Sequence, residues 1–537
     1  MAALLLCYLR IAGTTRVNSD GAGIALQGWD MLHGNVLLHG WWVTDFSVWT
    51  TELPQYALVS AVAGLRPEVV HVCAAITYTL LVLLAAFAAR GRVTGAEAAG
   101  RALLAALILL APEPGQGAYI VLLEPDHVGT GVPVLAVLLL LDLAPRRWWV
   151  PVLTAVLLTW GLLGDPLFLV AAVGPLLALL ITRMFLALRR GGTLRGLWFE
   201  FSLAAAAALA VAAARAISTL VTALGGFNVN LLTQETTSGL LAGLTNDVRG
   251  VLALFGADPG NYSDRWATVT GGVPGHLQSG PEVAFALIHL LGVAVVIAAV
   301  AAAARRLFRT LAGPAMGPED LVPGLMVAMI VANLAVFFAV YRAGDVAVGR
   351  EVAPVLAVAA ALAGRQFGGP LAEAVLGAAG PARAVLRGSL AAVIACYCAM
   401  LGYAAVQPQV PPASASLAAW LTDHGLREGL APYWDATSVT LDSGGAVTMA
   451  AVSGIPGSAR LGPIRWESDT RLSDPATHQA NFLVLADDPG VTLRQAVATF
   501  GQPARTYHYQ AYTILVWRKN LLRSWASPLC DRGGRLR

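Results

Sequence analysis

Long apolar segments, separated by short polar connections, fill the first 406 residues of the chain. A helix needs about 20 apolar residues to cross the ~30 Å hydrocarbon core of a bilayer. Most of the segments have close to this length, although the first and the tenth are shorter. The pattern predicts a polytopic α-helical membrane protein with about eleven transmembrane helices, at residues 1–13, 67–89, 94–111, 129–144, 148–164, 166–187, 199–222, 281–303, 321–341, 351–364 and 388–406.

The pattern changes at a proline-rich stretch, QPQVPP, at residues 407–412. Beyond it, alternating polar and apolar residues and turn signals replace the long apolar segments. These patterns divide the chain into a transmembrane domain at 1–406 and a small α/β domain at 407–537. We expect helices in ASLAAWLTDHGL and TLRQAVATFG, a hairpin turning at Ser443-Gly444-Gly445 in TSVTLDSGGAVTMAAV, a buried strand in ANFLVLAD and one strand in RTYHYQAYTILVW. The domain has no Ser-His-Asp motif, glycine-rich phosphate loop or metal cluster, so we expect it to cap the site or contact the acceptor.

Composition agrees with a membrane protein and excludes several function classes. The chain is 57% hydrophobic and 12% charged, against roughly 25% charged residues in soluble proteins. Its formal net charge is +3, and no basic or acidic tail indicates a nucleic-acid partner. The cysteines show neither a disulfide framework nor zinc-ligand spacing.

Arginine positions predict the orientation in the membrane. They concentrate in every second connection, and the loops of cytoplasmic membrane proteins that carry most arginine and lysine face the cytoplasm. The loops at 17–66, 112–128 and 225–280, together with the 407–537 domain, are then extracytoplasmic. The arginines on the expected cytoplasmic side are Arg90, Arg92, Arg146, Arg147, Arg189, Arg190, Arg195, Arg305, Arg306, Arg309, Arg365, Arg383 and Arg387.

The third outer loop contains an amphipathic pattern in TSGLLAGLTNDVRGVLALFG. Apolar residues recur there at helical spacing, with Asn246, Asp247 and Arg249 on the opposite face. This pattern predicts a helix that either lies in the membrane interface or packs under the C-terminal domain.

The first outer loop is polar and aromatic although it adjoins very apolar sequence. Asp20 follows the first apolar segment by a few residues, so we expect it near the outer membrane surface, where ionisable groups are often functional. The following GAGIALQGWDMLHG is compatible with an interfacial helix, and its region is rich in tryptophan, as interfacial belts are. Asp30 and Asp45 are expected to be structural.

The second outer loop adds an acidic and histidine cluster in LLEPDHVGTGVP. Glu124, Asp126 and His127 together can hold a divalent cation or orient a substrate hydroxyl. The alternative is a solvated helix start at which Asp126 is the N-cap.

These features together resemble the GT-C superfamily of polyprenyl-phosphate-sugar-dependent glycosyltransferases, which includes protein O-mannosyltransferases and aminoarabinose transferases. The shared features are an aspartate after the first span, an acidic and histidine cluster in the next outer loop, about eleven spans and a C-terminal outer domain. The stretch HGLREGLAPYWDATSVTLDSGG resembles the start of the outer domain in uncharacterised actinobacterial members. Protein O-mannosyltransferases carry an Asp-Glu pair where this chain has Asp20-Gly21.

The resemblance implies an inverting glycosyltransferase of the cytoplasmic membrane. Asp20 would be the general base that deprotonates an acceptor hydroxyl on an envelope glycan, lipid or protein. Glu124, Asp126 and His127 would contact the acceptor or a metal, with Glu124 and His127 as ligands of a divalent cation. Arg350 and Arg342 would bind the phosphate of the lipid-linked donor through their planar guanidinium groups.

Other interpretations stay open at this point. Asp20 is alternatively a helix cap or a surface charge, and Arg350 an interface anchor or a partner of Glu351. The whole chain is alternatively a transporter or flippase for a lipid-linked precursor, or a silent scaffold. Against a transporter, the sequence shows no inverted repeat or paired broken helices, and Asp142 and Asp165 lie near span ends. An outward cavity that joins Asp20, Glu124 and His127 would favour the enzyme.

Overall fold

The computed structural model describes residues 1–113, 116–123, 127–144, 146–191, 193–229, 240–260, 280–312, 318–340, 346–376, 380–486 and 490–525. Each expected apolar segment forms a helix. The eleven helices are α1 (Ala2–Ala12), α4 (Glu68–Arg90), α5 (Gly95–Leu109), α7 (Gly131–Leu143), α8 (Val150–Gly164), α9 (Gly174–Arg189), α10 (Trp198–Ala223), α13 (Gly280–Ala312), α14 (Leu321–Val340), α15 (Ala353–Leu376) and α16 (Pro381–Ala405).

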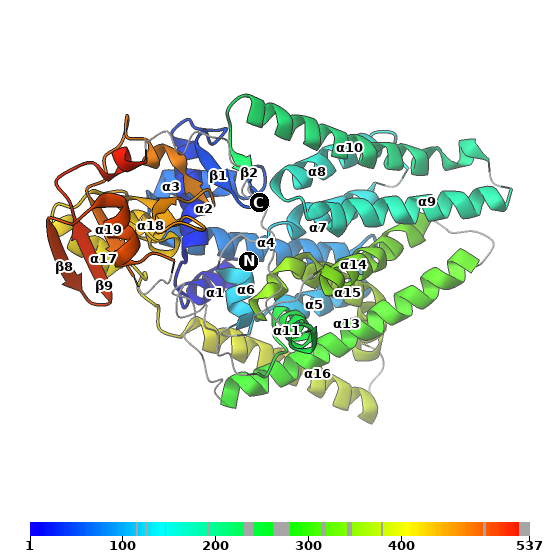
Figure 1. Cartoon of the computed structure of the whole chain (residues 1–537). Helices are drawn as coiled ribbons and strands as arrows, with labels where there is room; N and C mark the ends of the chain where they lie inside the picture. The colour runs from blue at the N-terminus through cyan, green and yellow to red at the C-terminus, as the bar shows by residue number, and fades with distance from the viewer. Residues whose placement is uncertain are drawn as a thin grey trace.

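Within the described residues, seven helical segments are long and apolar enough to cross a membrane. The helices α1, α5, α7 and α8 are shorter, with 11 to 15 residues. A π-helical turn, η1 (Leu169–Val173), extends α9 at its start. The chain is a multi-pass α-helical membrane protein, as its sequence predicts (Figure 1).

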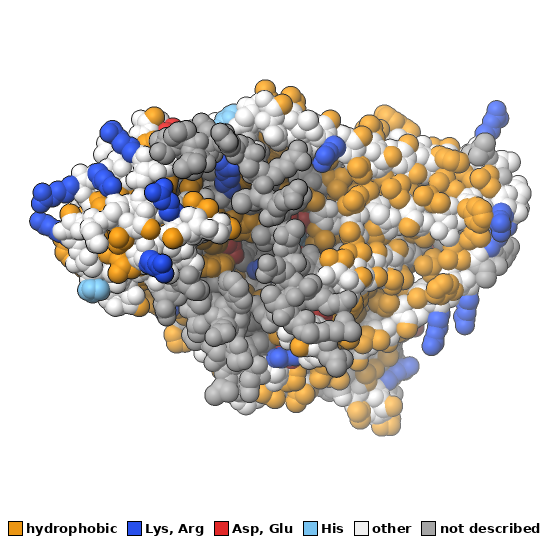
Figure 2. Space-filling view, in the orientation of Figure 1, with side chains coloured by type: hydrophobic (Ala, Val, Ile, Leu, Met, Phe, Trp, Pro, Cys, Tyr) orange, Lys and Arg blue, Asp and Glu red, His pale blue; other side chains and the backbone are white. Residues whose placement is uncertain are grey.

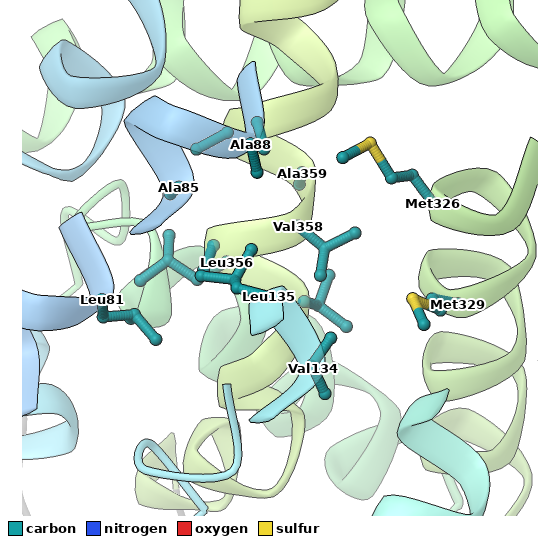
Figure 3. Close-up of a cluster of buried hydrophobic side chains, with 14 of the residues drawn as sticks. Leu81, Ala85, Ala88, Val134, Leu135, Met326, Met329, Leu356, Val358 and Ala359 are labelled. Atoms are coloured by element: carbon teal, nitrogen blue, oxygen red, sulfur yellow. The ribbon is translucent and has the colours of Figure 1, made fainter. Parts of the chain in front are cut away.

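The middle of the bundle is packed with aliphatic side chains from four helices. Figure 3 shows residues of α4, α7, α14 and α15 facing one another. Close approach between α5 and α15 depends on small residues: a Cβ at Gly100 would lie 2.3 Å from the Gly368 carbonyl oxygen, and one at Gly364 would lie 2.4 Å from that of Arg101. The labelled core residues are Leu81, Ala85, Ala88, Val134, Leu135, Met326, Met329, Leu356, Val358 and Ala359.

The first outer loop forms two helices and a strand, α2 (Ser19–Leu32), β1 (Trp41–Val43) and α3 (Leu53–Ala63). β1 lies at the centre of a three-stranded sheet. It pairs in parallel with β2 (Asn228–Val229) of the third outer loop and antiparallel with β6 (Ser468–Asp469) of the C-terminal domain. This sheet joins three segments that lie far apart in the sequence.

The amphipathic segment of the third outer loop is helical, as α11 (Leu240–Leu254). It packs on the 3₁₀ helix η4 (Val346–Val352) and on α6 (Gln116–Leu122). Asp247 is buried, whereas Leu244 and Val248 are exposed. Asp247 is therefore turned inward while two apolar residues of the same helix face outward, and apolar residues on the outer surface suit the membrane interface.

The C-terminal domain is an α/β sandwich around a six-stranded sheet in the order β5-β4-β3-β7-β9-β8. One face carries α17 (Ala415–Asp423) and α18 (Tyr433–Asp442), and the other carries α19 (Leu493–Phe500). β3 pairs in parallel with both β4 and β7. The strands are β3 (Glu428–Ala431), β4 (Thr448–Gly454), β5 (Leu461–Pro463), β7 (Phe482–Leu485), β8 (Arg505–Tyr509) and β9 (Tyr512–Val516).

Two local predictions in this domain were wrong. The expected hairpin in TSVTLDSGGAVTMAAV is the end of α18 followed by β4, because parallel strands β3 and β4 need a crossover between them. Gly444 and Gly445, both at positive φ, end that helix instead of turning a hairpin. The segment RTYHYQAYTILVW is two strands, β8 and β9, joined by a tight turn with Gln510 at φ 52°.

Candidate active site

Asp20 lies in the first turn of α2, where the first outer loop meets the C-terminal domain. The N-cap of this helix is Asn18, whose Oδ1 accepts a hydrogen bond from the Gly21 N–H at 2.9 Å. The capping role therefore belongs to Asn18, and the Asp20 carboxylate makes other contacts. Its Oδ1 accepts a hydrogen bond from the hydroxyl of Tyr433, the first residue of α18.

The Tyr433 hydroxyl also contacts Oε2 of Glu467, just before β6. Tyr433 and Glu467 are only 9% and 3% exposed, whereas Asp20 is half-buried. Burial, with the two carboxylates adding to it, raises the pKa of Tyr433 well above its usual value of 10.0. The phenol thus keeps its proton at neutral pH. We call Asp20, Tyr433 and Glu467 the Asp20 cluster.

A second group of ionisable residues surrounds His127, in the loop before α7. His127 Nδ1 lies 2.8 Å from Oδ2 of Asp165, and its Nε2 lies 3.0 Å from Oε2 of Glu351. Asp165 is the C-cap residue of α8 and also accepts hydrogen bonds from the Thr130 hydroxyl and the Leu167 N–H. Three separate parts of the chain thus meet at one buried imidazole.

The ring of His127 is positively charged in this arrangement. Burial favours the neutral ring, but Asp165 and Glu351 outweigh it and hold the pKa of His127 well above its usual value of 6.5. Both ring nitrogens are then N–H donors, one to each carboxylate. The imidazolium therefore connects the loop before α7 to the end of α8 and to η4.

Two further carboxylates from the first outer loop lie in electrostatic range of this histidine. Glu52, directly before α3, is 3% exposed, and neither of its oxygens has a hydrogen-bond partner in the described part of the chain. Burial raises the pKa of Glu52 to about 8. Asp45 is exposed by its surface area, yet partial loss of hydration raises its pKa as well; the positive charge of His127 opposes this rise, and Glu351 and Asp165 add to it. His127, Asp165, Glu351, Asp45 and Glu52 form the His127 cluster.

Glycine allows a close approach where Glu52 meets the loop before α7. A Cβ at Gly129 would lie 1.3 Å from Glu52 Oε1. A Cβ at Gly164 would lie 2.6 Å from the side chain of Thr51, beside it. The two glycines let the first and second outer loops and the end of α8 approach closely.

Of the other predicted site residues, Arg350 is described and lies in η4 next to Glu351. Glu124, Asp126 and Arg342 lie outside the described residues. Since Glu351 contacts His127, the structure brings the second outer loop and the Arg350 segment together. Asp20, in contrast, contacts the C-terminal domain.

No group of three or more His, Cys, Asp or Glu side chains among the described residues is arranged to hold a metal ion. Both nitrogens of His127 are occupied by carboxylates, so this ring does not fit a metal ligand in the observed arrangement. The role of Glu124 and His127 as ligands of a divalent cation stays a prediction.

Asp30, predicted to be structural, lies in a hydrogen-bonded network. Its Oδ2 accepts hydrogen bonds from Arg471 at 2.6 Å and from the indole of Trp41 at 2.9 Å. Arg471 also pairs with Asp469 at 2.7 Å. This network attaches the first outer loop to the C-terminal domain.

Sequence reasoning missed Glu52, Asp165, Tyr433 and Glu467, and considered Glu351 only as a partner of Arg350. The carboxylates of Glu52 and Asp165 had a weak signal, because each is a single acidic residue next to a long apolar segment and a proline. Glu467 had no signal in the sequence. The feature that distinguishes it is its backbone conformation, with φ 38°, and the sequence does not show backbone conformation.

Comparison with known proteins supports the fold. No protein-family model and no protein of curated function matches the chain. Two solved structures of ArnT from Cupriavidus metallidurans are similar to the structure of this chain, and each match covers 96% of both chains. The one bound to undecaprenyl phosphate has 15% identity and a TM-score of 0.52, and the apo structure 14% and 0.55.

The archaeal oligosaccharyltransferase AglB from Archaeoglobus fulgidus, solved with an inhibitory peptide and a dolichol-phosphate, is 12% identical with a TM-score of 0.47. The match covers 90% of this chain and 69% of AglB. The match to ArnT extends over nearly the full length of both chains, so the chain has the same overall fold as ArnT.

Proposed function

We propose that this protein is an inverting membrane glycosyltransferase that moves a sugar from a polyprenyl-phosphate donor to an envelope acceptor on the outer face of the cytoplasmic membrane. One observation carries the proposal. Asp20 of the first outer loop contacts the C-terminal domain, and His127 of the second outer loop pairs with Asp165 at the end of α8 and with Glu351 of η4, in a fold shared with ArnT, whose structure was solved with undecaprenyl phosphate bound.

Asp20 is the proposed general base. It is half-buried, and its Tyr433 contact uses one oxygen of the carboxylate. In an inverting transfer, the acceptor O–H loses its proton to Asp20 while its oxygen bonds to the anomeric carbon. The bond from that carbon to the phosphate oxygen breaks, and the lipid phosphate leaves as an anion.

Arg350 is the proposed ligand of the donor phosphate. Its neighbour Glu351 is held by the buried His127, so the segment that carries Arg350 is anchored from the inside. A planar guanidinium can contact two phosphate oxygens and stabilise charge that develops on the leaving group. The His127 cluster thus supports the donor side of the proposed site, and Asp20 the acceptor side.

The interior of the bundle gives a transporter little support. A transporter binds its substrate near the middle of the membrane, on polar or unwound helical segments. In this chain α4, α7, α14 and α15 meet there through aliphatic side chains (Figure 3). The Asp20 cluster lies instead where α2 meets the C-terminal domain, and the His127 cluster joins the loop before α7 to the end of α8 and to η4.

The experiment is sugar transfer by the purified protein in detergent, from radiolabelled polyprenyl-phosphate mannose or arabinose to envelope extracts. Asp20→Asn keeps the side-chain size but cannot accept the proton, so the transfer rate should fall about 10²–10⁴-fold, with donor binding retained. Asp423→Asn, at the end of α17, is the matched control. Loss of transfer in Asp45→Asn but not in Asp20→Asn would make Asp45 the base, and wild-type rates in both would exclude these two aspartates as the base.

A further inference from the structure

The C-terminal domain contributes two side chains to the proposed base. Tyr433 and Glu467 come from separate segments of this domain, and the Tyr433 hydroxyl contacts both Glu467 and Asp20. Glu467 also lies against the first turn of α2, where a Cβ at Gly23 would be 3.9 Å from Glu467 Oε2. Tyr433 and Glu467 are both buried, in a domain that the sequence predicts to cap the site or contact the acceptor.

Further hydrogen bonds hold α18, which begins with Tyr433, against the start of α2. The Ser19 hydroxyl donates to the Tyr433 carbonyl at 3.0 Å, and the Thr437 hydroxyl donates to the Ser19 carbonyl at 3.0 Å. α18 packs along α2 (Figure 1). Directly after Glu467, Ser468 pairs with Trp42 in the three-stranded sheet. The Asp20 cluster is therefore fixed from two sides.

The backbone of Glu467 indicates that its side chain is there for more than packing. Its φ of 38° lies in the left-handed region, which is unfavourable for a residue with a Cβ. Such strain persists where the surrounding structure enforces it, and it is concentrated at functional sites. Glycine would adopt this conformation without strain, yet the chain has a buried carboxylate.

The number of protons available limits how the three groups interact. The tyrosine hydroxyl has one proton and can donate it to one carboxylate only. While both carboxyl groups are ionised, the second contact lacks a proton, and a proton taken up by either carboxyl group makes both contacts hydrogen bonds. The cluster is thus arranged to hold a proton between Asp20 and Glu467, with Tyr433 as the bridge.

We propose that Tyr433 and Glu467 are positioning residues of the active site that orient Asp20 and receive the proton it takes from the acceptor. This inference rests on the proposed function. After transfer, protonated Asp20 donates to the Tyr433 oxygen as Tyr433 donates its own proton to Glu467. Tyr433 ends as it began, Asp20 is again a carboxylate, and Glu467 later releases the proton to water.

The inference predicts a split between turnover and binding. Tyr433→Phe removes the bridge and Glu467→Gln removes the terminal proton acceptor, so each should lower kcat about 10- to 100-fold, as misplacement of a catalytic group does. The donor KM should not change, because neither residue contacts the donor. Ser438→Ala is the matched control, since its hydroxyl lies 3.1 Å from that of Ser19 in the same interface but does not touch Asp20.

Glu467→Gly separates the proposed role from a purely structural one. Glycine relieves the backbone strain, so the melting temperature of the detergent-solubilised protein should not fall. The proposal predicts that kcat nevertheless falls as in Glu467→Gln, because the carboxylate is lost. Glu467→Gly with wild-type kcat would overturn the inference. So would wild-type kcat in both Tyr433→Phe and Glu467→Gln, or an equal loss in Ser438→Ala, which would indicate domain docking alone.

The outcome for the inference can be told apart from the outcome for the function. If the wild-type protein transfers no sugar, or Asp20→Asn transfers at the wild-type rate, the proposed function has failed. If the wild type is active and Asp20→Asn is not, the function stands. In that case the Tyr433 and Glu467 variants alone decide whether the C-terminal domain takes part in the chemistry.

Discussion

At the scale of single residues, the two acids of the first loop that face His127 differ in their exposure to water. Asp45 is exposed, whereas Glu52 is buried among Gly129, Thr51 and the start of α3. A buried carboxyl group without a hydrogen-bond partner is costly in its charged form, so it takes up a proton instead. Glu52 is therefore neutral at neutral pH, and it adds no charge to the site.

Glu52 should make stability depend on pH. Its pKa rises from the ordinary value of 4.5 to about 8 in the folded protein, so the folded state binds more protons than the unfolded state between these values. Its contribution to stability is complete below about pH 4.5 and is lost as the pH rises to about 8. Over that window, wild type should lose up to about 1.4 kcal/mol per pH unit relative to Glu52→Gln.

The measurement is the melting temperature of both proteins in detergent from pH 5 to pH 9. Glutamine imitates the neutral acid, so the two proteins should melt at similar temperatures at pH 5, and the variant should be the more stable one at pH 9. A constant difference across the range would show that Glu52 is not buried as a neutral acid.

The residues found from sequence share one property: they stand out locally. Asp20 is an acid just after an apolar segment, and His127 lies in a short acidic motif. Asp165 and Glu351 contact His127 from positions 38 residues and more than 200 residues away. Nothing near them in the sequence indicates these contacts, because tertiary folding alone creates them.

At the scale of elements, the position of η4 depends on its contact with α11. The two backbones touch directly, since a Cβ at Gly349 would lie 2.2 Å from the carbonyl oxygen of Gly250. This contact supports η4 on one side, and the Glu351–His127 pair supports it on the other. Arg350 lies between the two supports.

Gly349→Ala should therefore separate α11 from η4. We expect a loss of about 1–3 kcal/mol in stability, as for other overpacked contacts, together with weaker apparent donor affinity if Arg350 binds the phosphate. Gly402→Ala in α16 is the control, because nothing lies within 4 Å of its added Cβ. There the change should stabilise by about 0.5–1 kcal/mol, since alanine favours the helix. Equal melting temperatures for both variants would contradict the close contact.

Elements with long regular periodicity were predictable, and short ones were less so. The apolar segments from α4 to α16 follow from length and hydropathy alone. α18 was predicted as strand because Thr and Val at 437–440 favour extended structure. The crossover between two parallel strands overrides this preference, and strand pairing cannot be read from one segment.

At the scale of the whole molecule, charge and apolar surface are separated along the bundle. Figure 2 shows apolar side chains over the helical part, with Lys and Arg at its far end, opposite the C-terminal domain. Acidic partners lie at that far end as well: Asp142 pairs with Arg365 at 2.5 Å, and Glu200 with Arg146 at 3.2 Å. The arginines from which the orientation is predicted thus lie at one end of the bundle, and the orientation itself stays a prediction.

Cysteine labelling tests this orientation. Ser458, in the exposed turn between β4 and β5, belongs to the end that carries the Asp20 cluster. Exposed Thr193 lies in the connection between α9 and α10, near Arg189, Arg190 and Arg195. In a background without native cysteines, Ser458→Cys should react with a membrane-impermeant maleimide in intact cells. Thr193→Cys should react only after permeabilisation. The reverse pattern would put Asp20, Tyr433 and Glu467 in the cytoplasm, and the acceptor would then have to be cytoplasmic. Labelling of both sites in intact cells would mean that the helices between them do not separate two compartments. Only the expected pattern places the proposed base where an envelope acceptor and an outward-facing lipid-linked sugar can reach it together.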